Sequence, residues 1–295
     1  MPKAKAAPTA TAIDLSYLKA ARLLLAEHHT VRITLVGCGG TGSWLAPSIV
    51  RLARSLKDAG RGVEVVFVDP DKVEPKNTLR QNFCDAEVGL PKAHALASRY
   101  GLAWGLGITA VKDRFDPSSV SHVWNTLVIM VGCVDNADGR AQLTRALSHN
   151  RRGSAPHIFH LDCGNTAEAG QVYLGTAAEA ADLKGAFISP GFCQTLPAPA
   201  LQQPALLVPR PEEKTDNNLS CAEIQQANFQ SLCVNQKVAA EAADYLLRLA
   251  TGGELRRFAT YFDLASGSSR SRYTTPEEVA SVIDRPLSYV IDYER

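Results

Sequence analysis

The chain has 295 residues, its 31 lysines and arginines nearly balance its 30 aspartates and glutamates, and 45% of its residues are apolar. This composition argues against non-specific binding to nucleic acid or membrane surfaces, which depends on clustered positive charge. Seven irregularly spaced cysteines do not resemble a secreted disulfide framework, and no segment approaches the roughly 18 apolar residues of a membrane span. We expect a globular cytoplasmic protein without a nucleic-acid or membrane partner.

The first elements lead into a glycine-rich turn. Residues 1–12 are rich in alanine, proline, lysine and threonine, and we expect a disordered tail. Apolar residues recur at helical spacing over 13–28, which predicts an amphipathic helix. Residues 31–36 have the β-branched content of a buried strand, and Gly37-Cys-Gly-Gly-Thr-Gly42 connects them to a helical pattern that extends to Leu56. The pattern predicts a strand, a turn and a helix.

Further strands and helices alternate along the chain. Helical patterns are expected from about 91 to 102 and up to 147, and a short helix begins at 276. Strands are predicted at 63–68, 108–111, 127–131, 158–161, 171–174 and 259–264. This alternation predicts an α/β fold with a Rossmann-like, doubly wound, mostly parallel sheet.

A long irregular segment precedes the last long helix. Its prolines lie at 190, 197, 199, 204, 209 and 211, and we interpret residues 175–219 as a mobile crossover loop. Ser220-Cys-Ala-Glu223 is a capping-box pattern that opens a helix, which is expected to end near Ala250 before Gly252-Gly253. We therefore divide the chain into a domain over 13–253 and a C-terminal extension over 254–295 with a strand and a short helix.

The glycines at 37, 39, 40 and 42 favour a nucleotide ligand. They allow the backbone to turn sharply and approach a ligand, while the next helix presents N–H groups and a positive dipole to phosphate. Such turns also occur for packing alone. A dinucleotide site expects an acidic residue about 20 residues later, whereas Asp69 comes 27 residues after Gly42. The fit to a nicotinamide-dependent dehydrogenase is therefore imperfect.

Five motifs follow one another in a distinctive order. They are the glycine turn, Asp69-Pro-Asp-Lys-Val-Glu-Pro-Lys-Asn77, Arg80-Gln81, Val88-Gly89 with Pro91-Lys92, and Asp135-Asn136 with Arg140. Over about residues 32–250 the chain resembles the ThiF/MoeB/HesA family of ubiquitin-activating-enzyme-like adenylyltransferases, and within it the ThiF-family component of the plasmid-associated PRTRC gene system. The resemblance implies that ATP activates the C-terminal carboxylate of a small ubiquitin-like or sulfur-carrier protein as an acyl-adenylate.

The resemblance also assigns roles to residues. It implies that Asp69 holds the ribose, that Arg80 and Lys92 act on the phosphates, and that Asp135 holds Mg²⁺. The other residues that it assigns to the nucleotide site are Gly37, Gly39, Gly40, Gly42, Asp71, Asn77, Gln81 and Asn136. A carboxylate with a pKa of roughly 3.5 needs no general base at pH 7, so the lack of a Ser/His/Asp arrangement agrees with this chemistry. In the alternative interpretation, the aspartates end a strand and the cations are surface charges.

A second step would transfer the acyl group to a thiol. Cys221 is the first candidate, because Ser220 as the N-cap would place it at a helix start, where the dipole lowers a thiol pKa. The family comparison also places a cysteine just before this helix. Cys193, in the proline-rich segment, is the second candidate. Cysteines in or beside apolar elements, at 38, 133, 163 and 233, are interpreted as core residues.

Three further features concern possible zinc ligands, two histidines and an arginine that could act across a dimer. Many relatives bind structural zinc with two Cys-x-x-Cys pairs, and this chain has none, which argues against zinc. His157 and His160 have no further ligand nearby in sequence, so we interpret them as structural. Family members are commonly homodimers in which an arginine reaches the partner's ATP, and Arg22 is the loose equivalent.

The resemblance also allows a conjugating enzyme as a partner. Two other functions remain open at this stage: a non-catalytic nucleotide-binding scaffold that recognises a partner's tail, and an NAD-dependent oxidoreductase. The joint presence of Arg80 and Lys92 is the sequence feature that counts against the scaffold.

Overall fold

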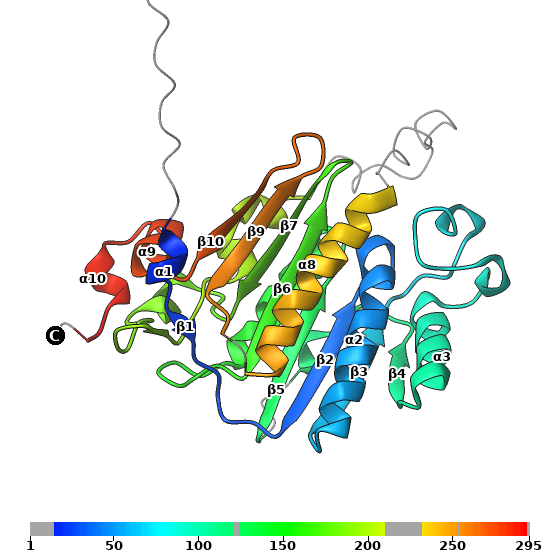
Figure 1. Ribbon diagram of the computed structural model, residues 1–295, viewed down its shortest axis with the longest axis horizontal. Coiled ribbons are helices and arrows are strands. Elements are labelled where there is room, and N and C mark those ends of the chain that lie inside the picture. Colours follow the sequence, from blue (N-terminus) through cyan, green and yellow to red (C-terminus); the bar gives the residue numbers. More distant parts are fainter. Residues whose placement is uncertain (1–14, 121–123, 210–231, 253, 294–295) are drawn as a thin grey trace, which may run out of the picture.

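The fold is built on an eight-stranded sheet, shown in Figure 1 as part of a computed structural model. The structure describes residues 15–120, 124–209, 232–252 and 254–293. Across the sheet the strands lie in the order β10-β9-β7-β6-β5-β2-β3-β4. Their bounds are β2 Thr30–Val36, β3 Gly62–Val68, β4 Ile108–Val111, β5 Thr126–Gly132, β6 Ile158–Asn165, β7 Ala169–Gly175, β9 Arg257–Asp263 and β10 Ser269–Tyr273.

The direction of the strands confirms the predicted Rossmann-like α/β fold. Strands β2 to β6 run parallel, and β7, β9 and β10 extend the sheet through antiparallel pairs. The parallel part has the order β6-β5-β2-β3-β4, so the direction of winding reverses between β2 and β5. The loops that follow β2, β3 and β5 therefore meet near this switch point, where open α/β sheets bind ligands.

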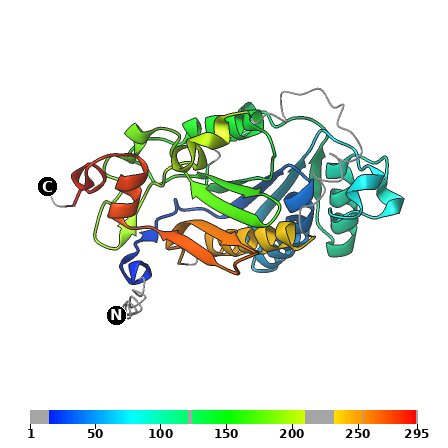
Figure 2. The same cartoon turned by 90° about the horizontal axis from the view of Figure 1, so that it is seen from above.

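Helices cover both faces of the sheet, as the view from above in Figure 2 shows. On one face lie α2 (Gly40–Asp58), α3 (Lys92–Trp104) and α8 (Leu232–Ala250), and on the other lies α4 (Ala137–Ala146). The shorter helices are α1 Ser16–Lys19, α5 Pro199–Gln202, α9 Pro276–Val282 and α10 Leu287–Val290. The 3-10 turns are η1 Pro75–Asn77, η2 Asp85–Glu87, η3 Pro117–Ser119, η4 Leu147–His149, η5 Ala180–Leu183 and η6 Pro204–Leu207.

Strand β5 lies at the centre of the core. All of its residues are buried, and they alternate between two hydrophobic clusters. Ile129 belongs to the cluster that also holds residues of α2 and α8, whereas Met130 packs with Leu143 of α4. Burial on both faces explains why this strand reads as an uninterrupted apolar run in the sequence.

The helix predicted over 13–28 is wrong in its described part. Only α1 is helical there, and Arg22–Leu23 form a short strand, β1, that pairs in parallel with β8 (Phe192–Cys193). The N–H of Arg22 donates to the carbonyl of Gly191 at 2.8 Å. Pairing with a segment far away in sequence thus replaces the local helical bonds, because tertiary contacts override the modest preference of a short helical pattern.

The proline-rich segment after β7 contains short elements in its described part, residues 176–209. Pro199 and Pro204 open α5 and η6, where a missing N–H costs no helical hydrogen bond. Phe187 and Leu196 of this segment are buried in the main core. The helix start expected at Ser220 and the candidate Cys221 lie outside the described residues, whereas the predicted end of the helix at Ala250 is confirmed.

The C-terminal part adds an edge strand that the sequence did not predict. Strand β9 matches the expected strand, and β10 pairs with it in antiparallel fashion. Residues 269–273 read Ser-Arg-Ser-Arg-Tyr, and an edge strand that is half exposed does not need the apolar alternation by which strands are recognised.

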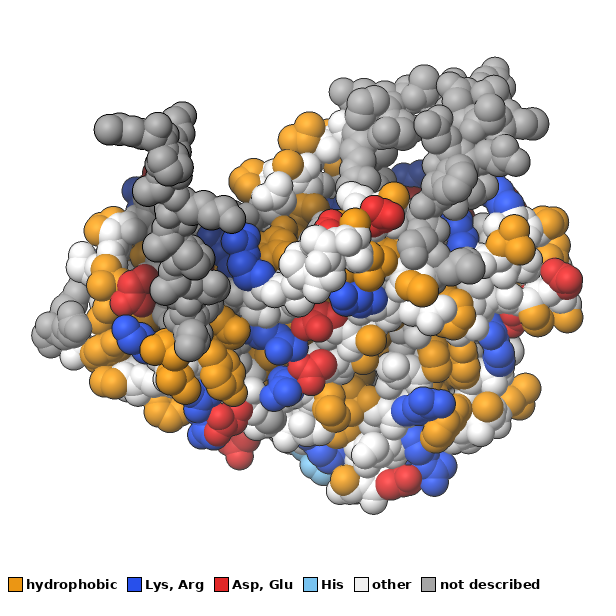
Figure 3. Space-filling view, turned by 45° about the horizontal axis from the view of Figure 1, so that its top comes forward, with side chains coloured by type: hydrophobic (Ala, Val, Ile, Leu, Met, Phe, Trp, Pro, Cys, Tyr) orange, Lys and Arg blue, Asp and Glu red, His pale blue; other side chains and the backbone are white. Residues whose placement is uncertain are grey.

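The surface agrees with the near-neutral composition. On the face that Figure 3 shows, positive, negative and apolar side chains are interspersed. No described helix has the combination of length and apolar character that a membrane crossing requires.

Candidate functional site

Two adjoining cavities lie at the carboxyl edge of the sheet. The smaller cavity, of about 190 Å³, is lined by Gly39, Gly40, Thr41, Asp69, Asp71, Arg80, Gln81, Lys92, Cys133, Val134, Asp135, Arg140, Cys163, Gly164, Asn165 and Asn235. The larger cavity, of about 510 Å³, is lined by Val36, Gly37, Val68, Asp69, Pro70, Asp71, Asp113, Arg114, Phe115, Val134, Asp135, Asn136, Asp138, Gly139 and Gln142. Both lists contain Asp69, Asp71, Val134 and Asp135, so the two cavities form one continuous site.

The glycines of the turn after β2 have different surroundings. Gly37 has a φ of +89°, and a Cβ there would lie 2.5 Å from the carbonyl oxygen of Cys133. A Cβ on Gly42 would overlap the carbonyl oxygen of Gly37. A Cβ on Gly39 would have no neighbour closer than 3.8 Å. The fold therefore requires glycine at positions 37 and 42, whereas Gly39 leaves space at the smaller cavity.

Asp69 is fixed at the end of β3 by the backbone around it. Its Oδ2 accepts from the N–H of Cys38 at 2.6 Å, and its Oδ1 accepts from the N–H of Asp71 at 2.8 Å. Burial raises the pKa of the Asp69 carboxyl, and the charge of Lys92 and the two N–H donors act in the opposite direction. The carboxyl thus links the glycine turn to β3 and lies at the junction of the two cavities.

Two cations and an amide face the smaller cavity from the chain between β3 and α3. The buried Lys92, at the start of α3, places Nζ 3.1 Å from Asp71 Oδ2. Arg80 and Gln81 follow η1, and Gln81 is buried with its Oε1 unpartnered among the described residues. The structure therefore brings Arg80, Lys92 and the two aspartates that follow β3 together, as the motifs predict.

Asp135 and Asn136 lie at the other side of the site, after β5. Asp135 is exposed and lines both cavities, and its Oδ1 accepts from Asn136 Nδ2 at 3.2 Å. Asn136 caps α4, because its Oδ1 accepts from the N–H of Gly139 at 2.8 Å. Asp135 therefore offers its carboxylate to the cavity, while Asn136 is held by the helix that it begins.

The ThiF family model matches residues 19–180, which is more than half of the chain. The chain belongs to the ThiF family. This confirms the family that the five motifs indicate. No curated protein matches the sequence of this ThiF-family protein.

Solved structures of the same fold are distant in sequence. The crystal structure of E. coli MccB with ATP has a TM-score of 0.51 and 15% identity, and the match covers 88% of this chain and 65% of that chain. PaaA gives a TM-score of 0.50 and 15% identity over 83% of this chain and 64% of that chain. The ThiF-family protein thus spans less than two thirds of the length of these neighbours, and the likeness concerns the fold.

Several predicted residues lie away from the two cavities. Gly42 and Asn77 line neither cavity, and Asn77 is buried with its Oδ1 accepting from the N–H of Glu74 at 2.8 Å. Arg22 is on β1, where it forms an ion pair with Glu254 of the same chain. Cys193 is fully buried, and burial raises the pKa of its thiol to about 12. A thiolate at Cys193 is therefore scarce at neutral pH.

Sequence reasoning missed the contribution of α8 to this site. Asn235 of α8 lines the smaller cavity with Asn165 from β6 and Thr41 from α2. These residues are up to 194 positions apart, and each is an ordinary polar residue on its own. No local motif marks them, so only the packing of α8 against α2 could reveal their proximity.

A buried polar network of Arg140, Asp162 and His160 lies next to the smaller cavity. Arg140 Nε donates to Asp162 Oδ2 at 3.1 Å, and His160 Nε2 lies 3.9 Å from the same oxygen. Burial, with the nearby Arg140 charge, lowers the pKa of His160 to about 3, so His160 is neutral at pH 7. Burial raises the pKa of Asp162, against the effect of Arg140. This network fixes Arg140 at the cavity wall.

Proposed function

We propose that this protein is an ATP-dependent adenylyltransferase that activates the C-terminal carboxylate of a small ubiquitin-like or sulfur-carrier protein. One observation carries the proposal: Lys92, paired with Asp71, faces the same small cavity as the open Gly39 at the start of α2. Two solved structures of one protein with the same fold support it: E. coli MccB with ATP, and MccB with AMPCPP and MccA.

The reaction requires positioning rather than a general base. A carboxylate oxygen of the carrier attacks the α-phosphorus of ATP and forms the new O–P bond of the acyl-adenylate. The bond from the α-phosphorus to the bridging oxygen breaks, and pyrophosphate leaves. Because the attacking carboxylate is already ionised at neutral pH, no proton has to be removed. The protein's task is to orient the two reactants and to neutralise phosphate charge, for which we assign Arg80 and Lys92.

The nucleotide would occupy both cavities. We assign the triphosphate to the smaller cavity, where the N-terminus of α2 favours negative charge. The nucleoside then lies in the larger cavity, whose volume of about 510 Å³ is within the usual range for small ligands. Asp69, at the junction, is the acceptor for the ribose hydroxyls. Asn77 and Gly42 support the loops that carry this site rather than contacting the nucleotide.

The exposed carboxylate of Asp135 is a suitable ligand for Mg²⁺. Magnesium prefers oxygen ligands and is commonly held by one or two carboxylates together with substrate phosphates. Among the described residues, no group of three or more His, Cys, Asp or Glu side chains could hold a metal ion by itself. Asp135 would hold Mg²⁺, and the ion would supply positive charge that neutralises the phosphate oxygens.

A thioester step is assigned to Cys221. The burial of Cys193 and the raised pKa of its thiol favour Cys221 over the alternative. In a thioester step the thiolate sulfur attacks the acyl carbon, the bond from that carbon to the phosphate oxygen breaks, and AMP leaves.

Three further expectations from the family resemblance are also part of the proposal. We propose that the protein forms a homodimer, that it transfers the acyl group to a conjugating enzyme, and that it is related to the ThiF-family component of the PRTRC system. In that homodimer we assign Arg22, which pairs with Glu254 in its own chain, as the arginine that acts on the partner's ATP.

The test is carrier-dependent exchange of labelled pyrophosphate into ATP with Mg²⁺. The Lys92→Ala variant should lose about 100-fold or more of this exchange, which is the usual cost of removing one charge-stabilising group. Lys76→Ala is the matched control, because Lys76 is an exposed lysine of η1, between β3 and α3, and lies outside both cavities. We expect this variant to retain wild-type exchange.

The same assay separates the two chemical steps. Cys221→Ala should retain exchange and lose a carrier adduct that thiol reductants cleave, and persistence of that adduct would move the thioester elsewhere. If the folded wild-type protein binds ATP but exchanges no pyrophosphate with any candidate carrier, the enzyme proposal fails and the scaffold remains. Preferential binding of NAD would instead favour an oxidoreductase.

A further inference from the structure

The amide of Asn235 is a buried donor at the edge of the smaller cavity. Its side chain comes from α8 and is only 1% exposed. Its Oδ1 accepts from Asn165 Nδ2 at 2.8 Å and from Thr41 Oγ1 at 3.2 Å. Its Nδ2 has no hydrogen-bond partner among the described residues. Because a buried amide without a partner is costly, this N–H₂ group calls for an acceptor.

The neighbours of Asn235 define what kind of acceptor fits. Its oxygen is already saturated by two donors, so only donation is left to the amide. The amide touches the backbone where α2 begins, since a Cβ on Gly40 would lie 2.8 Å from Asn235 Oδ1 and 3.2 Å from Nδ2. The start of this 19-residue helix favours negative charge. A group that accepts hydrogen bonds and carries negative charge fits both requirements, as a phosphate oxygen does.

The cations of the same cavity support this choice. Arg80, Lys92 and Arg140 line it together with Asn235. Lys92 is paired with Asp71, which also lines the cavity, and Arg140 is paired with the buried Asp162, so carboxylates hold both cations in place. A nucleotide phosphate at the start of α2 would therefore meet positive charge from one side and the Asn235 amide from α8.

We propose that Asn235 Nδ2 donates a hydrogen bond to a phosphate oxygen of the bound nucleotide, so that α8 completes the phosphate site that the glycine turn begins. The inference rests on the proposed function, because it assumes that the cavity holds a nucleotide. It adds a binding residue from outside the five motifs and couples nucleotide binding to the last long helix of the domain.

The test compares ATP with adenosine, which lacks phosphate, in equilibrium binding measurements. Asn235→Ala should weaken the binding of Mg-ATP by about 10- to 100-fold, the expected range for a hydrogen bond to a charged group. Adenosine affinity should stay within about twofold, because the adenosine moiety does not contact the amide. Asn235→Asp should weaken ATP binding further, because it replaces the donor with a negative charge.

A matched control removes a buried amide elsewhere. Gln202 is 9% exposed, and its Nε2 donates to the carbonyls of Leu174 and Pro197 at 2.8 Å each, outside both cavities. Gln202→Ala should destabilise the fold and leave ATP affinity unchanged. Adenosine binding also reports on folding, because a misfolded Asn235 variant would lose both ligands.

The outcomes separate the two proposals. If wild-type protein does not bind ATP, the proposed function fails and the inference fails with it. If wild-type protein binds ATP and both Asn235 variants bind it equally well, only the inference is overturned. An equal loss of ATP and adenosine affinity in variants that circular dichroism shows to be folded would also overturn it, because the amide would then act on the shape of the site rather than on phosphate.

Discussion

Gly39 and Gly42 belong to one turn, yet a side chain at each position would meet different surroundings. At Gly42 a Cβ would collide with the carbonyl oxygen of Gly37, whereas at Gly39 it would enter the space of the smaller cavity. In the sequence both residues look alike, and the family resemblance assigns both to phosphate binding. The structure separates a glycine that permits close packing from one that leaves room for a ligand.

This difference gives a prediction for a matched pair of variants. Gly42→Ala should lower the free energy of unfolding by about 1–3 kcal/mol, because overpacking forces the backbone to move. Gly39→Ala should cost less stability than Gly42→Ala, because its methyl group meets no close neighbour, and it should weaken ATP binding, because the methyl group occupies space beside the start of α2. Urea unfolding and calorimetric ATP titration measure the two effects. Normal ATP affinity in a folded Gly39→Ala protein would contradict the assigned phosphate position.

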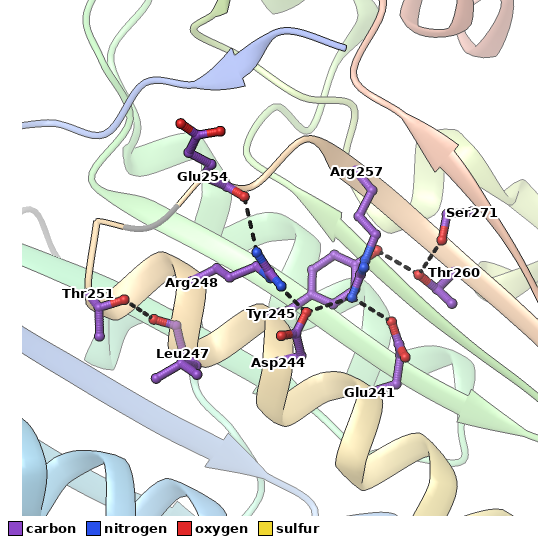
Figure 4. Close-up of polar contacts among 10 residues, drawn as sticks. All are labelled: Glu241, Asp244, Tyr245, Leu247, Arg248, Thr251, Glu254, Arg257, Thr260 and Ser271. Carbon is purple, nitrogen blue, oxygen red and sulfur yellow. Dashed lines mark hydrogen bonds and ion pairs between the residues drawn. The ribbon is translucent and has the colours of Figure 1, made fainter. Parts of the chain in front are cut away.

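At the scale of elements, α8 is attached to β9 by a network of charged side chains. Figure 4 shows Arg257 of β9 between Glu241 and Asp244 of α8. Arg257 Nη2 lies 2.8 Å from Glu241 Oε1 and 2.6 Å from Asp244 Oδ2, and its guanidinium lies over the ring of Tyr245 at 4.9 Å. This network holds the helix that carries Asn235 on the sheet.

Removing Arg257 should therefore loosen α8. We expect Arg257→Ala to lower the free energy of unfolding by about 2 kcal/mol, because hydrogen bonds to charged groups are lost and two carboxylates remain without their shared cation. Arg256→Ala is the neighbouring control, since Arg256 pairs with the more exposed Glu254 and should contribute at most about 1 kcal/mol. Urea unfolding of both variants checks this order. Equal losses would show that the Arg257 network is no stronger than a surface pair.

The sequence predicts elements well where their signal is local. The apolar run of β5 and the glycine turn each lie within a few residues, and both are where the sequence places them. Segments whose structure depends on distant partners are missed. Strand β1 forms because it pairs with β8, and Asn235 reaches the site because α8 packs beside α2. Neither partner can be identified from the spacing of nearby residues.

At the scale of the whole molecule, the site joins segments from most of the chain. Its lining runs from Val36 at the end of β2 to Asn235 on α8, and it includes the ends of β3 and β5 on both sides of the switch point. A ligand that contacts all of these segments binds only the folded protein. Binding should therefore stabilise the entire fold rather than one loop.

The last prediction follows from this linkage. At a free concentration 100 times its Kd, Mg-ATP should add about 2.7 kcal/mol to the free energy of unfolding and raise Tm by about 4 °C. NAD at the same concentration should raise Tm less, because the smaller cavity, which Arg80, Lys92 and Arg140 line, suits a chain of phosphates. Thermal unfolding followed by circular dichroism measures both shifts. The Lys92→Ala variant should show a smaller increase in Tm with Mg-ATP, and the Lys76→Ala variant should show the wild-type increase. A larger shift with NAD would reverse the assignment of the cavity, since the ligand that stabilises more at equal concentration is the one that binds the folded chain more tightly.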